Sequence, residues 1–218
     1  MKFVEPSFYW LGEIPDGTVM LRNIATAGRL CYQSEAKTPD DVFVRRRIAD
    51  GHESILEHEK ISVVVTCDRG VTHEAVRHRI GSYSQESTRY CNYSKDKFDN
   101  GITYIDITDA IYLDPQMSKL DEQTIVWIVQ EWWNACIDAE KHYLRMLELG
   151  ASPQIARSVL NHSTKTQIAI TFNLREWRHF FRLRCAPAAH PQMIQIARML
   201  LKAFREAIPV VFDDLEVE

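Results

Sequence analysis

The densest group of polar side chains lies between residues 77 and 90, which read RHRIGSYSQESTRY. Three arginines and a histidine fall within 13 residues of this segment, at Arg77, His78, Arg79 and Arg89. Guanidinium groups present forked donors that match phosphate oxygens, and serine hydroxyls with free backbone N–H groups can complete such a site. The composition therefore favours a loop that binds a phosphorylated small molecule. For the R-H-R triplet by itself, a solvated charged loop is the alternative.

A second group of polar side chains, HESILEH at residues 52–58, raises the question of a metal site. His52 and His58 lie six residues apart in it, whereas a zinc-binding H-E-x-x-H helix places its two histidines four residues apart. The spacing argues against this motif, and we expect no metal ligands in the chain. A metal-dependent hydrolase that uses His52, His58, His73 and His78 is an alternative hypothesis.

Arg184 ends a segment, residues 174–184, that has the periodicity of an amphipathic helix. At 100° per residue, one face of this helix is polar and the other is aromatic. The polar face consists of Arg175, Arg178, His179 and Arg182, and the apolar face consists of Leu174, Trp177, Phe180 and Phe181. Arg184 falls on the apolar face, where a guanidinium is costly to bury without an anion. We therefore expect Arg184 to have an anionic partner, either an acidic side chain or a ligand.

The segments around these groups predict the elements that position them. β-Branched and alternating residues predict strands over residues 60–67 and 165–173. Capping residues and apolar periodicity predict helices over residues 19–32 (capped by Thr18), 38–51, 70–79, 121–149, 174–184 and 190–207, with a further helix that begins at Ser152 and Pro153. Residues 80–100 are expected to form a polar, serine-rich loop. Helices around a few strands predict an α+β or α/β fold, in a single domain over residues 1–218.

The predicted helix over residues 121–149 has a wide apolar side, which includes Trp132 and Trp133. Apolar side chains at helical spacing mark the face that a helix buries. This face either packs in the core of the same chain or contacts a partner subunit. The sequence leaves both possibilities open.

The composition restricts the class of protein. The 218 residues carry a formal net charge of −4, which argues against a protein that coats nucleic acid. The five cysteines form no C-x-x-C pair, which argues against a disulfide framework or a cysteine-rich zinc site. The N-terminal residues lack the apolar core of a signal peptide, and no stretch is apolar for long enough to span a bilayer. We expect a cytoplasmic protein with neither a membrane nor a nucleic acid as partner.

The loop motif closely resembles the signature of the flavin-dependent (alternative) thymidylate synthase family. That signature is R-H-R, seven intervening residues and then Ser, followed closely by Arg and Tyr; here these are Arg77, His78, Arg79, Ser87, Arg89 and Tyr90. Four further segments are similar to motifs of the family: residues 52–58 (H-x-[ST]-x-x-E-H), residues 156–160 (A-R-x-x-L-P, with Asn161 in place of proline), residues 173–175 (N-x-R) and residues 183–184 (L-R). The resemblance thus extends over most of the chain.

The resemblance implies a reaction and a fold. The reaction is the reductive methylation of dUMP to dTMP, with FAD as cofactor and NADPH and 5,10-methylenetetrahydrofolate as co-substrates. The fold is a small mixed or antiparallel sheet flanked by helices that include one long central helix, in a homotetramer whose sites are shared between subunits. Arg184 is the implied catalytic residue, because its charge beside the pyrimidine would favour ionisation of N3 and raise the electron density at C5. None of the five cysteines lies in a motif that suggests an attacking thiol.

The same resemblance implies two sets of binding residues. The implied contacts to dUMP are Glu74, Arg77, Gln85, Glu86, Ser87, Thr88, Arg89, Arg157 and Arg184, with Arg89 and Arg157 near the phosphate. The implied contacts to FAD are Ser54, Arg77, His78, Arg79, Gln85, Asn173, Arg175 and His179. Glu74 stands where many family members carry Gln, and a carboxylate beside an anionic nucleotide needs an arginine to pair with it. His179 stands where Asn is common.

A nucleotide- or RNA-binding module without catalysis is the alternative from a different class. It would use the arginines of this loop beside Tyr83, Tyr90 and Tyr93, because aromatic rings can stack on bases. Such a module predicts a colourless protein that binds RNA tightly and in a salt-dependent way.

Overall fold

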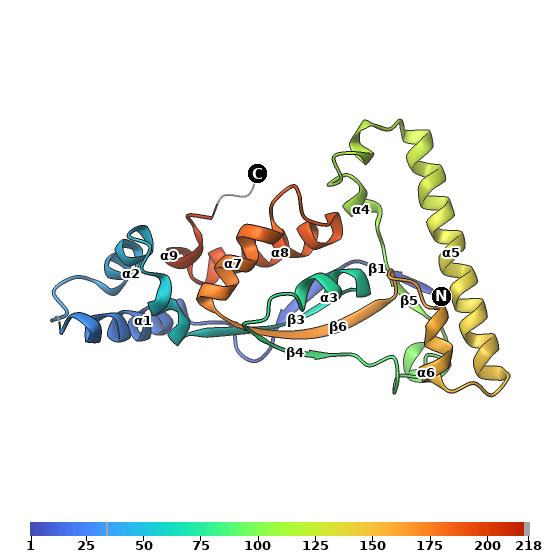
Figure 1. Ribbon diagram of the computed structural model, residues 1–218, viewed down its shortest axis with the longest axis horizontal. Coiled ribbons are helices and arrows are strands. Elements are labelled where there is room, and N and C mark those ends of the chain that lie inside the picture. Colours follow the sequence, from blue (N-terminus) through green and yellow to red (C-terminus); the bar gives the residue numbers. More distant parts are fainter. Residues whose placement is uncertain (34, 216–218) are drawn as a thin grey trace.

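The chain folds into an elongated molecule with a sheet near its centre and helices at both ends (Figure 1). The computed structural model describes residues 1–33 and 35–215. Helices α1 (Gly17–Tyr32) and α2 (Asp40–Ala49) form one end, and α5 (Glu122–Glu148) runs along the other. This mixed architecture confirms the predicted α+β fold class, and the long helix lies at one end of the molecule.

The central sheet has four strands in the order β2-β3-β6-β4, and each neighbouring pair is antiparallel. The strands are β2 (Ser7–Trp10), β3 (Lys60–Asp68), β4 (Ser82–Gln85) and β6 (Lys165–Asn173). Side chains of β6 alternate between half-buried and buried, because successive residues of a strand point to opposite faces. This alternation is visible in the sequence, so β6 has the predicted bounds, and β3 extends one residue beyond its prediction.

The prediction of a continuous loop over residues 80–100 is wrong at β4, which forms an edge strand of the sheet. Its sequence, SYSQ, alternates exposed serines with half-buried Tyr83 and Gln85. The serines resemble those of a loop, although the alternation is that of a strand. The Tyr83 hydroxyl is shared between the carbonyl oxygens of Ala75, at 2.7 Å, and His78, at 2.6 Å. The edge strand therefore fixes the R-H-R segment in place.

Helix α3 (Arg69–Ala75) is shorter than the predicted helix over residues 70–79. After Ala75 the backbone tightens, because the N–H groups of Arg77 and His78 donate to carbonyl oxygens three residues earlier. The R-H-R triplet consequently lies beyond the helix. The side chains of its two arginines are exposed, whereas the histidine is buried.

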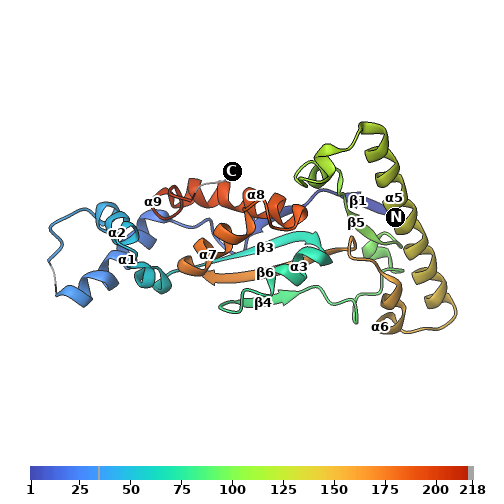
Figure 2. The same cartoon turned by 45° about the horizontal axis from the view of Figure 1, so that its top comes forward.

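Helices α7 (Leu174–Arg184) and α8 (Pro191–Ala207) cover one face of the central sheet together with α3 (Figures 1 and 2). Helix α7 has its predicted bounds, and α8 begins one residue later than predicted. The side chain of Asn173 caps α7 by accepting a hydrogen bond from the N–H of Glu176, at 2.8 Å. The main core lies between these helices and the sheet, and its largest buried side chains include Phe172, Trp177, Phe180, Phe181 and Phe204.

Arg178 departs from the pattern predicted for α7. The helical wheel places it on the polar face, but its side chain is only 1% exposed. Its guanidinium donates to Glu53 at 3.1 Å and to the two carboxylate oxygens of Asp214 at 2.6 Å. The polar face is covered here by the 3-10 segment η1 (Glu53–His58) and by the residues that follow α9 (Pro209–Phe212). A helical wheel contains no information on these distant segments.

The first helix begins with a different cap from the predicted one. The side chain of Asp16 accepts hydrogen bonds from the N–H groups of Thr18, at 2.9 Å, and Val19, at 3.2 Å. The prediction that Thr18 caps this helix is therefore wrong, since the carboxylate of Asp16 precedes it and suits the helix N-terminus better. Helix α2 begins at Asp40 and ends shortly before Gly51, whose φ of 77° suits the glycine predicted at the helix end.

A second, smaller cluster of buried side chains lies beside α5 and a two-stranded parallel sheet of β1 (Lys2–Val4) and β5 (Thr103–Ile105). The buried residues of this cluster are Tyr93, Ile102, Tyr104, Cys136, Tyr143 and Ala156. The short elements around it are α4 (Thr108–Ile111), α6 (Pro153–Ala156) and the 3-10 turns η2 (Asp96–Phe98), η3 (Met117–Lys119) and η4 (Arg157–Val159). The sequence does not predict β1 or β5, because three residues are too few to show an alternation.

Helix α5 packs on this cluster through only part of its length. Cys136, Ala139 and Tyr143 are the buried residues among its 27 positions. On the predicted apolar side, Ile128 is 36% exposed and Trp133 is 40% exposed within the single chain. The described part of the chain therefore covers the predicted apolar side only in part. Among residues 1–33 and 35–215, neither α5 nor another helix is both long and apolar enough to cross a membrane.

Candidate active site

Arg184 lies at the C-terminal end of α7, and three hydrogen bonds hold its guanidinium group. Nη1 donates to the Glu74 carboxylate at 2.5 Å, and Nη2 donates to the Glu74 carbonyl oxygen at 3.0 Å. Nε donates to Nε2 of His78 at 3.0 Å. The Arg184 side chain is 14% exposed. The anionic partner that the sequence requires is thus Glu74 of α3, and the same contact supplies the arginine that Glu74 needs.

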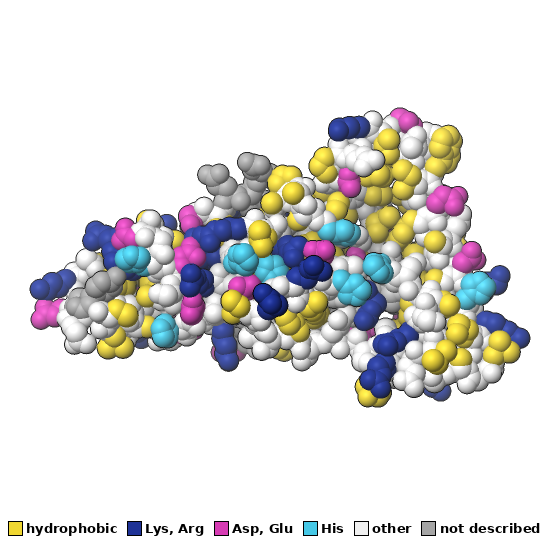
Figure 3. Space-filling view, in the orientation of Figure 1, with side chains coloured by type: hydrophobic (Ala, Val, Ile, Leu, Met, Phe, Trp, Pro, Cys, Tyr) yellow, Lys and Arg dark blue, Asp and Glu magenta, His cyan; other side chains and the backbone are white. Residues whose placement is uncertain are grey.

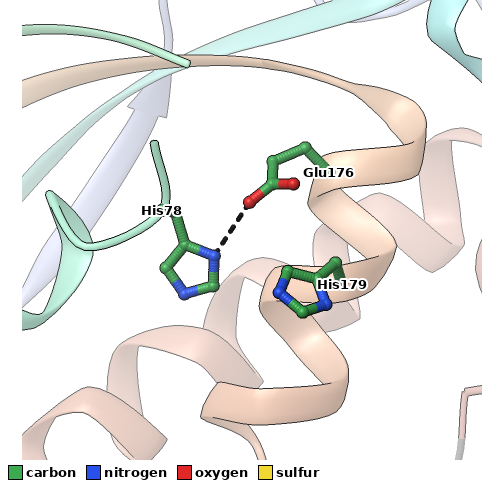
Figure 4. A group of neighbouring side chains, drawn as sticks. All are labelled: His78, Glu176 and His179. Carbon is green, nitrogen blue, oxygen red and sulfur yellow. Dashed lines mark hydrogen bonds and ion pairs between the residues drawn. The ribbon is translucent and has the colours of Figure 1, made fainter. Parts of the chain in front are cut away.

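His78 connects Arg184 to a second acid, Glu176, on the first turn of α7. Figure 4 shows the contact between His78 and Glu176. Nδ1 of His78 lies 3.0 Å from Oε1 of Glu176, and both side chains are buried. The imidazole packs against the rings of Phe172 and Phe180. Burial lowers the pKa of His78, and the charge of Arg184 lowers it further, while the hydrogen bond with Glu176 opposes both effects. The imidazole is therefore neutral near pH 7.

His78, Glu176 and His179 each offer one possible metal-ligand atom, and these atoms lie within 4.8 Å of one another. Figure 4 shows His179 beside the hydrogen-bonded pair, one turn further along α7. Both ring nitrogens of His78 are already engaged, and the cationic Arg184 in contact with the ring opposes a second cation. The geometry favours a hydrogen-bonded chain over a metal centre. In the part of the chain that the structure describes, the other histidines of the hydrolase hypothesis join no such group.

A cavity of about 510 Å³ lies beside these hydrogen-bonded residues, between α7 and η1. Its lining residues are Glu53, Glu57, Ile80, Asn173, Arg175, Glu176, His179 and Arg182. A second cavity, of about 390 Å³, shares Arg175 and includes Ser54. Four residues that the sequence assigns to FAD, namely Ser54, Asn173, Arg175 and His179, therefore line two cavities on either side of one arginine.

Arg175 lines both cavities and is the donor that could bind a phosphate group of FAD, beside the carboxylates of Glu53, Glu57 and Glu176. Arg175 pairs with Glu57 at 2.6 Å, and Arg182 pairs with Glu53 at 2.6 Å. The first pair is about half exposed on both sides, and an exposed ion pair contributes only about 0–1 kcal/mol. A phosphate group can therefore replace the Glu57 carboxylate on Arg175 at little cost.

A third cavity, of about 430 Å³, gathers cationic side chains beside α3. Its lining residues are Arg69, His73, Thr88, Gln154, Arg157, Ser158, Leu160, Asn161 and His162. The Arg157 guanidinium donates to the Thr88 hydroxyl at 3.1 Å, which joins two residues that the sequence assigns to dUMP. In the space-filling view of Figure 3, histidines and basic side chains, with acidic side chains among them, form a band across the middle of the molecule.

The sequence assigned neither Arg69 nor His162 of this cavity to a site, and it suggested His73 only for the metal-dependent hydrolase. Arg69 and His73 lie four residues apart and so share a face of α3, which is a signal the sequence contains. The ring of His162 meets that of His73 edge to face, with centroids 5.3 Å apart. Nη1 of Arg69 is buried and makes no hydrogen bond with the described residues. A buried cationic donor of this kind suits an anionic ligand.

Gln85 and Glu86, also assigned to the ligands, make contacts within the chain. Nε2 of Gln85 donates to the hydroxyl of Thr72 at 3.1 Å. The Glu86 carboxylate accepts from Nζ of Lys165 at 2.9 Å and from the hydroxyl of Tyr93 at 2.9 Å. These bonds tie the segment after β4 to β6 and orient the residues that follow it.

The arginines of the loop motif lie at the surface. The guanidinium of Arg89 lies over the ring of Tyr90, 5.4 Å from its centroid, and the N–H of Arg89 donates to the Ser87 hydroxyl at 3.3 Å. Arg77 and Arg79 are exposed as well. The structure thus brings Arg184, Glu74 and His78 together, and Thr88 with Arg157, but it leaves these three arginines on the surface of the single chain.

The comparisons with known proteins identify the family. The family model described as thymidylate synthase complementing protein matches residues 18–210. A flavin-dependent thymidylate synthase of Mycobacterium tuberculosis is 31% identical over 97% of this chain and 85% of its own length. The enzyme of that name from Corynebacterium diphtheriae is 32% identical over 87% of this chain and 77% of its own length. The chain belongs to the thymidylate synthase complementing protein family.

A solved structure agrees with the family's fold. A UMP/dUMP methylase from Streptomyces cacaoi, bound with 5-Br dUMP, superposes with a TM-score of 0.77. The alignment covers 98% of this chain and 96% of that one, at 23% sequence identity. At this identity the likeness shows the fold alone, and it confirms the α+β architecture expected of a family member.

Family membership and geometry both disfavour the RNA-binding alternative. Of the three tyrosines that could stack on bases, Tyr83 is half-buried with its hydroxyl engaged, and Tyr93 is buried. Only Tyr90 among the three presents its ring to solvent. A stacking surface needs several exposed rings along a strand of nucleic acid, and these tyrosines do not form one.

Most of the cysteines are buried or partly buried and are poor candidates for an attacking thiol. All five are free. Burial raises the pKa of Cys67 and Cys136, and it raises the pKa of Cys185 to about 11. Since the thiolate is the nucleophile, these three side chains are poorly suited to attack a pyrimidine.

Proposed function

We propose that this chain methylates C5 of dUMP to give dTMP, with FAD as cofactor, 5,10-methylenetetrahydrofolate as one-carbon donor and NADPH as reductant. Family membership supports the reaction class. The observation that carries the site assignment is the partly buried guanidinium of Arg184, held by Glu74 and His78 beside the cavity of Arg175. A fixed positive charge in a partly desolvated site stabilises negative charge that develops on a substrate.

Arg184 acts on the uracil ring of the nucleotide. Its guanidinium cannot lose its proton near neutral pH, so it favours the form of uracil that has lost the N3 proton. The resulting electron density makes C5 nucleophilic toward the one-carbon unit. The chemistry that a bound reduced flavin supplies is the hydride that completes the methyl group.

The cavities divide the binding roles between them. We assign the phosphate of dUMP to the cavity of Thr88 and Arg157, where Arg69 adds a second guanidinium and His73 adds an imidazole. We assign FAD to the two cavities that meet at Arg175. The exposed loop arginines then complete these sites in the assembled protein.

Assembly into a homotetramer is part of the proposal. It is supported by the exposed tryptophans of α5 and by the arginines of the loop motif, which lie exposed on the surface of the single chain. The net charge and the family's small-molecule chemistry support the absence of nucleic acid partners. The five free thiols support a reducing compartment such as the cytoplasm.

An absorption and turnover experiment tests the proposal. The purified protein is expected to be yellow, with the spectrum of an oxidised flavin, or to acquire that spectrum when FAD is added. With 5,10-methylenetetrahydrofolate present, dUMP should accelerate NADPH oxidation and yield dTMP. A protein that binds no flavin, or that oxidises NADPH without forming dTMP in the presence of dUMP, contradicts the proposed function.

A further inference from the structure

The orientation of Arg184 depends on the protonation of His78. A guanidinium has donors but no acceptor, so Nε2 of His78 must accept the Nε–H of Arg184 and must itself be unprotonated. The proton of the neutral imidazole therefore lies on Nδ1, where it is donated to Glu176 at 3.0 Å. A single tautomer of His78 satisfies both contacts, and Glu176 selects it.

We propose that Glu176 and His78 are positioning residues for the reaction, which hold Arg184 in the orientation that the uracil ring requires. Glu176 fixes the tautomer of His78, and His78 fixes the Nε edge of Arg184. The inference rests on the proposed function, because it concerns the group on which Arg184 acts. His78, which the sequence assigned to FAD, thereby gains a second role, and Glu176, which the sequence left unassigned, gains its first.

The structure distinguishes a fixed contact of Arg184 from an exchangeable one. His78 is buried, with the rings of Phe172 and Phe180 centred 6.0 and 5.1 Å from its own. The Glu74 side chain, by contrast, is 38% exposed. A carboxylate that reaches solvent can turn away at small cost, since water replaces its hydrogen bonds. We therefore expect the nucleotide to replace Glu74 at Nη1 of Arg184 while the contact with His78 persists.

Glu176 is itself firmly held. Its N–H is bonded to the cap residue Asn173, and its carboxylate lies on the first turn of α7, where the helix dipole favours a negative charge. The side chain lines the cavity of Arg175 but is only 9% exposed, so little water competes for the hydrogen bond with His78. An amide in place of this carboxylate keeps the shape of the side chain. The amide can donate hydrogen bonds as well as accept them, whereas the ionised carboxylate can only accept them.

The variant Glu176→Gln tests this role in the FAD-loaded enzyme. The variant removes the negative charge that holds the ring proton of His78 on Nδ1, and its NH2 group can donate to Nδ1, in which case the ring proton lies on Nε2 and points at Arg184. Displacement of a reacting group by 1 Å can cost 10²-fold in rate, so kcat for dTMP formation should fall on the order of 10²-fold. The matched control is Glu206→Gln, at an exposed position of α8, which should stay within about twofold of the unmodified chain.

A double-mutant cycle separates positioning from a general structural effect. In the Arg184→Lys background the Nε–H contact is gone, so Glu176→Gln has no oriented guanidinium left to disturb. In that background Glu176→Gln should leave kcat almost unchanged, whereas in the unmodified chain it should lower kcat about 10²-fold. Equal losses in the two backgrounds overturn the inference, and so does a Glu176→Gln enzyme with full activity.

A second pair of variants guards against a failure to fold. His78→Gln retains a carbonyl oxygen that can accept from Nε of Arg184, whereas His78→Ala does not. His78→Gln should therefore keep a clearly higher kcat than His78→Ala at equal flavin occupancy. Equal losses in these two variants also overturn the inference. An unmodified chain that forms no dTMP from dUMP overturns the proposed function, and the positioning role fails with it.

Discussion

At the scale of single residues, the features that matter are two buried or partly buried charges on α7. Arg184 faces the aromatic side of the helix and finds Glu74 and His78, whereas Arg178 is buried between Glu53 and Asp214. Both arginines satisfy the rule that a buried guanidinium needs acceptors. They differ in their own exposure, since the Arg178 side chain is 1% exposed and the Arg184 side chain is 14% exposed. Arg184 can therefore reach a ligand when its partly exposed partner Glu74 turns away, which suits a residue that acts on a substrate.

Arg184→Ala should lower kcat for dTMP formation by about 10²- to 10³-fold, the usual cost of removing one group that stabilises developing charge. Flavin binding and folding should change little, because the freed Glu74 carboxylate can be hydrated. Product assays and a flavin titration on the same preparation measure the two effects. Activity close to that of the unmodified chain would remove Arg184 from the chemistry.

His78 should make stability depend on pH. Its pKa in the folded chain is lowered, first by burial and then by Arg184, with His179 also nearby and Glu176 acting in the opposite direction. The unfolded chain, with a pKa of about 6.5 for histidine, therefore binds the proton first as pH falls. The contribution of neutral His78 to stability is present above about pH 6.5 and is lost as the pH falls below it, toward the folded pKa.

Denaturant unfolding at pH 7.5 and pH 5.5 measures this effect. The free energy of unfolding of the unmodified chain should be lower at pH 5.5 than at pH 7.5. The difference should be smaller in the His78→Gln variant, which lacks the titrating ring. Equal pH dependence in the two proteins would show that other groups cause the change.

At the scale of elements, the site depends on how the R-H-R segment crosses from α3 to the edge strand β4. Gly81 lies at this crossing, against β6. A Cβ atom at Gly81 would lie 2.2 Å from the ring of Phe172 and 3.1 Å from the carbonyl oxygen of Thr171. The absence of a side chain at Gly81 thus allows β4 to pair closely with β6, and this pairing brings His78 up to α7.

Gly81→Ala should destabilise the protein by about 1–3 kcal/mol, the typical cost of overpacking a core contact. It should also lower activity, since the segment that holds His78 would have to move away from Phe172. Thermal and denaturant unfolding measure the first effect. Ser82→Ala, at the exposed neighbouring position, is the control and should unfold like the unmodified chain. A fully stable Gly81→Ala variant would show that this crossing has room to adjust.

At the scale of the whole molecule, α5 is the element that a single chain covers least. Its solvent-facing side carries Val126, Trp127 and Ile128, which are 57%, 62% and 36% exposed. Large exposed apolar groups on one helix are typical of surfaces that another protein covers. The proposed homotetramer offers such a cover and would also bring loop arginines of different subunits together.

Trp127→Glu should therefore weaken assembly, because a charge would be buried in an apolar contact between subunits. Light scattering coupled to size-exclusion chromatography should show smaller species, with activity reduced in parallel. Ile14→Glu places the same charge at a position that is 72% exposed and precedes α1, and it should leave the assembly unchanged. A Trp127→Glu protein of unaltered mass would remove this face from the interface.

The sequence by itself determined the elements whose patterns are local. β-Branched residues located β3, alternation over nine residues located β6, and helical periodicity located α7. The loop motif, together with the segments near residues 54, 157 and 173, was sufficient to indicate the family. Shorter strands such as β1, β4 and β5 escaped prediction, since three or four residues carry too little periodicity to identify a strand.

Only the tertiary structure decided which groups meet. Periodicity shows that Arg184 faces the core, but its partner Glu74 is 110 residues away in the sequence. The same holds for Arg178 with Glu53, 125 residues apart, and for the cavity that joins Arg69 to Arg157. A pattern along the chain records which face of an element is buried. The group that lies against that face depends on the packing of elements that are distant in sequence, and it is this packing that sets the charge and orientation of the site.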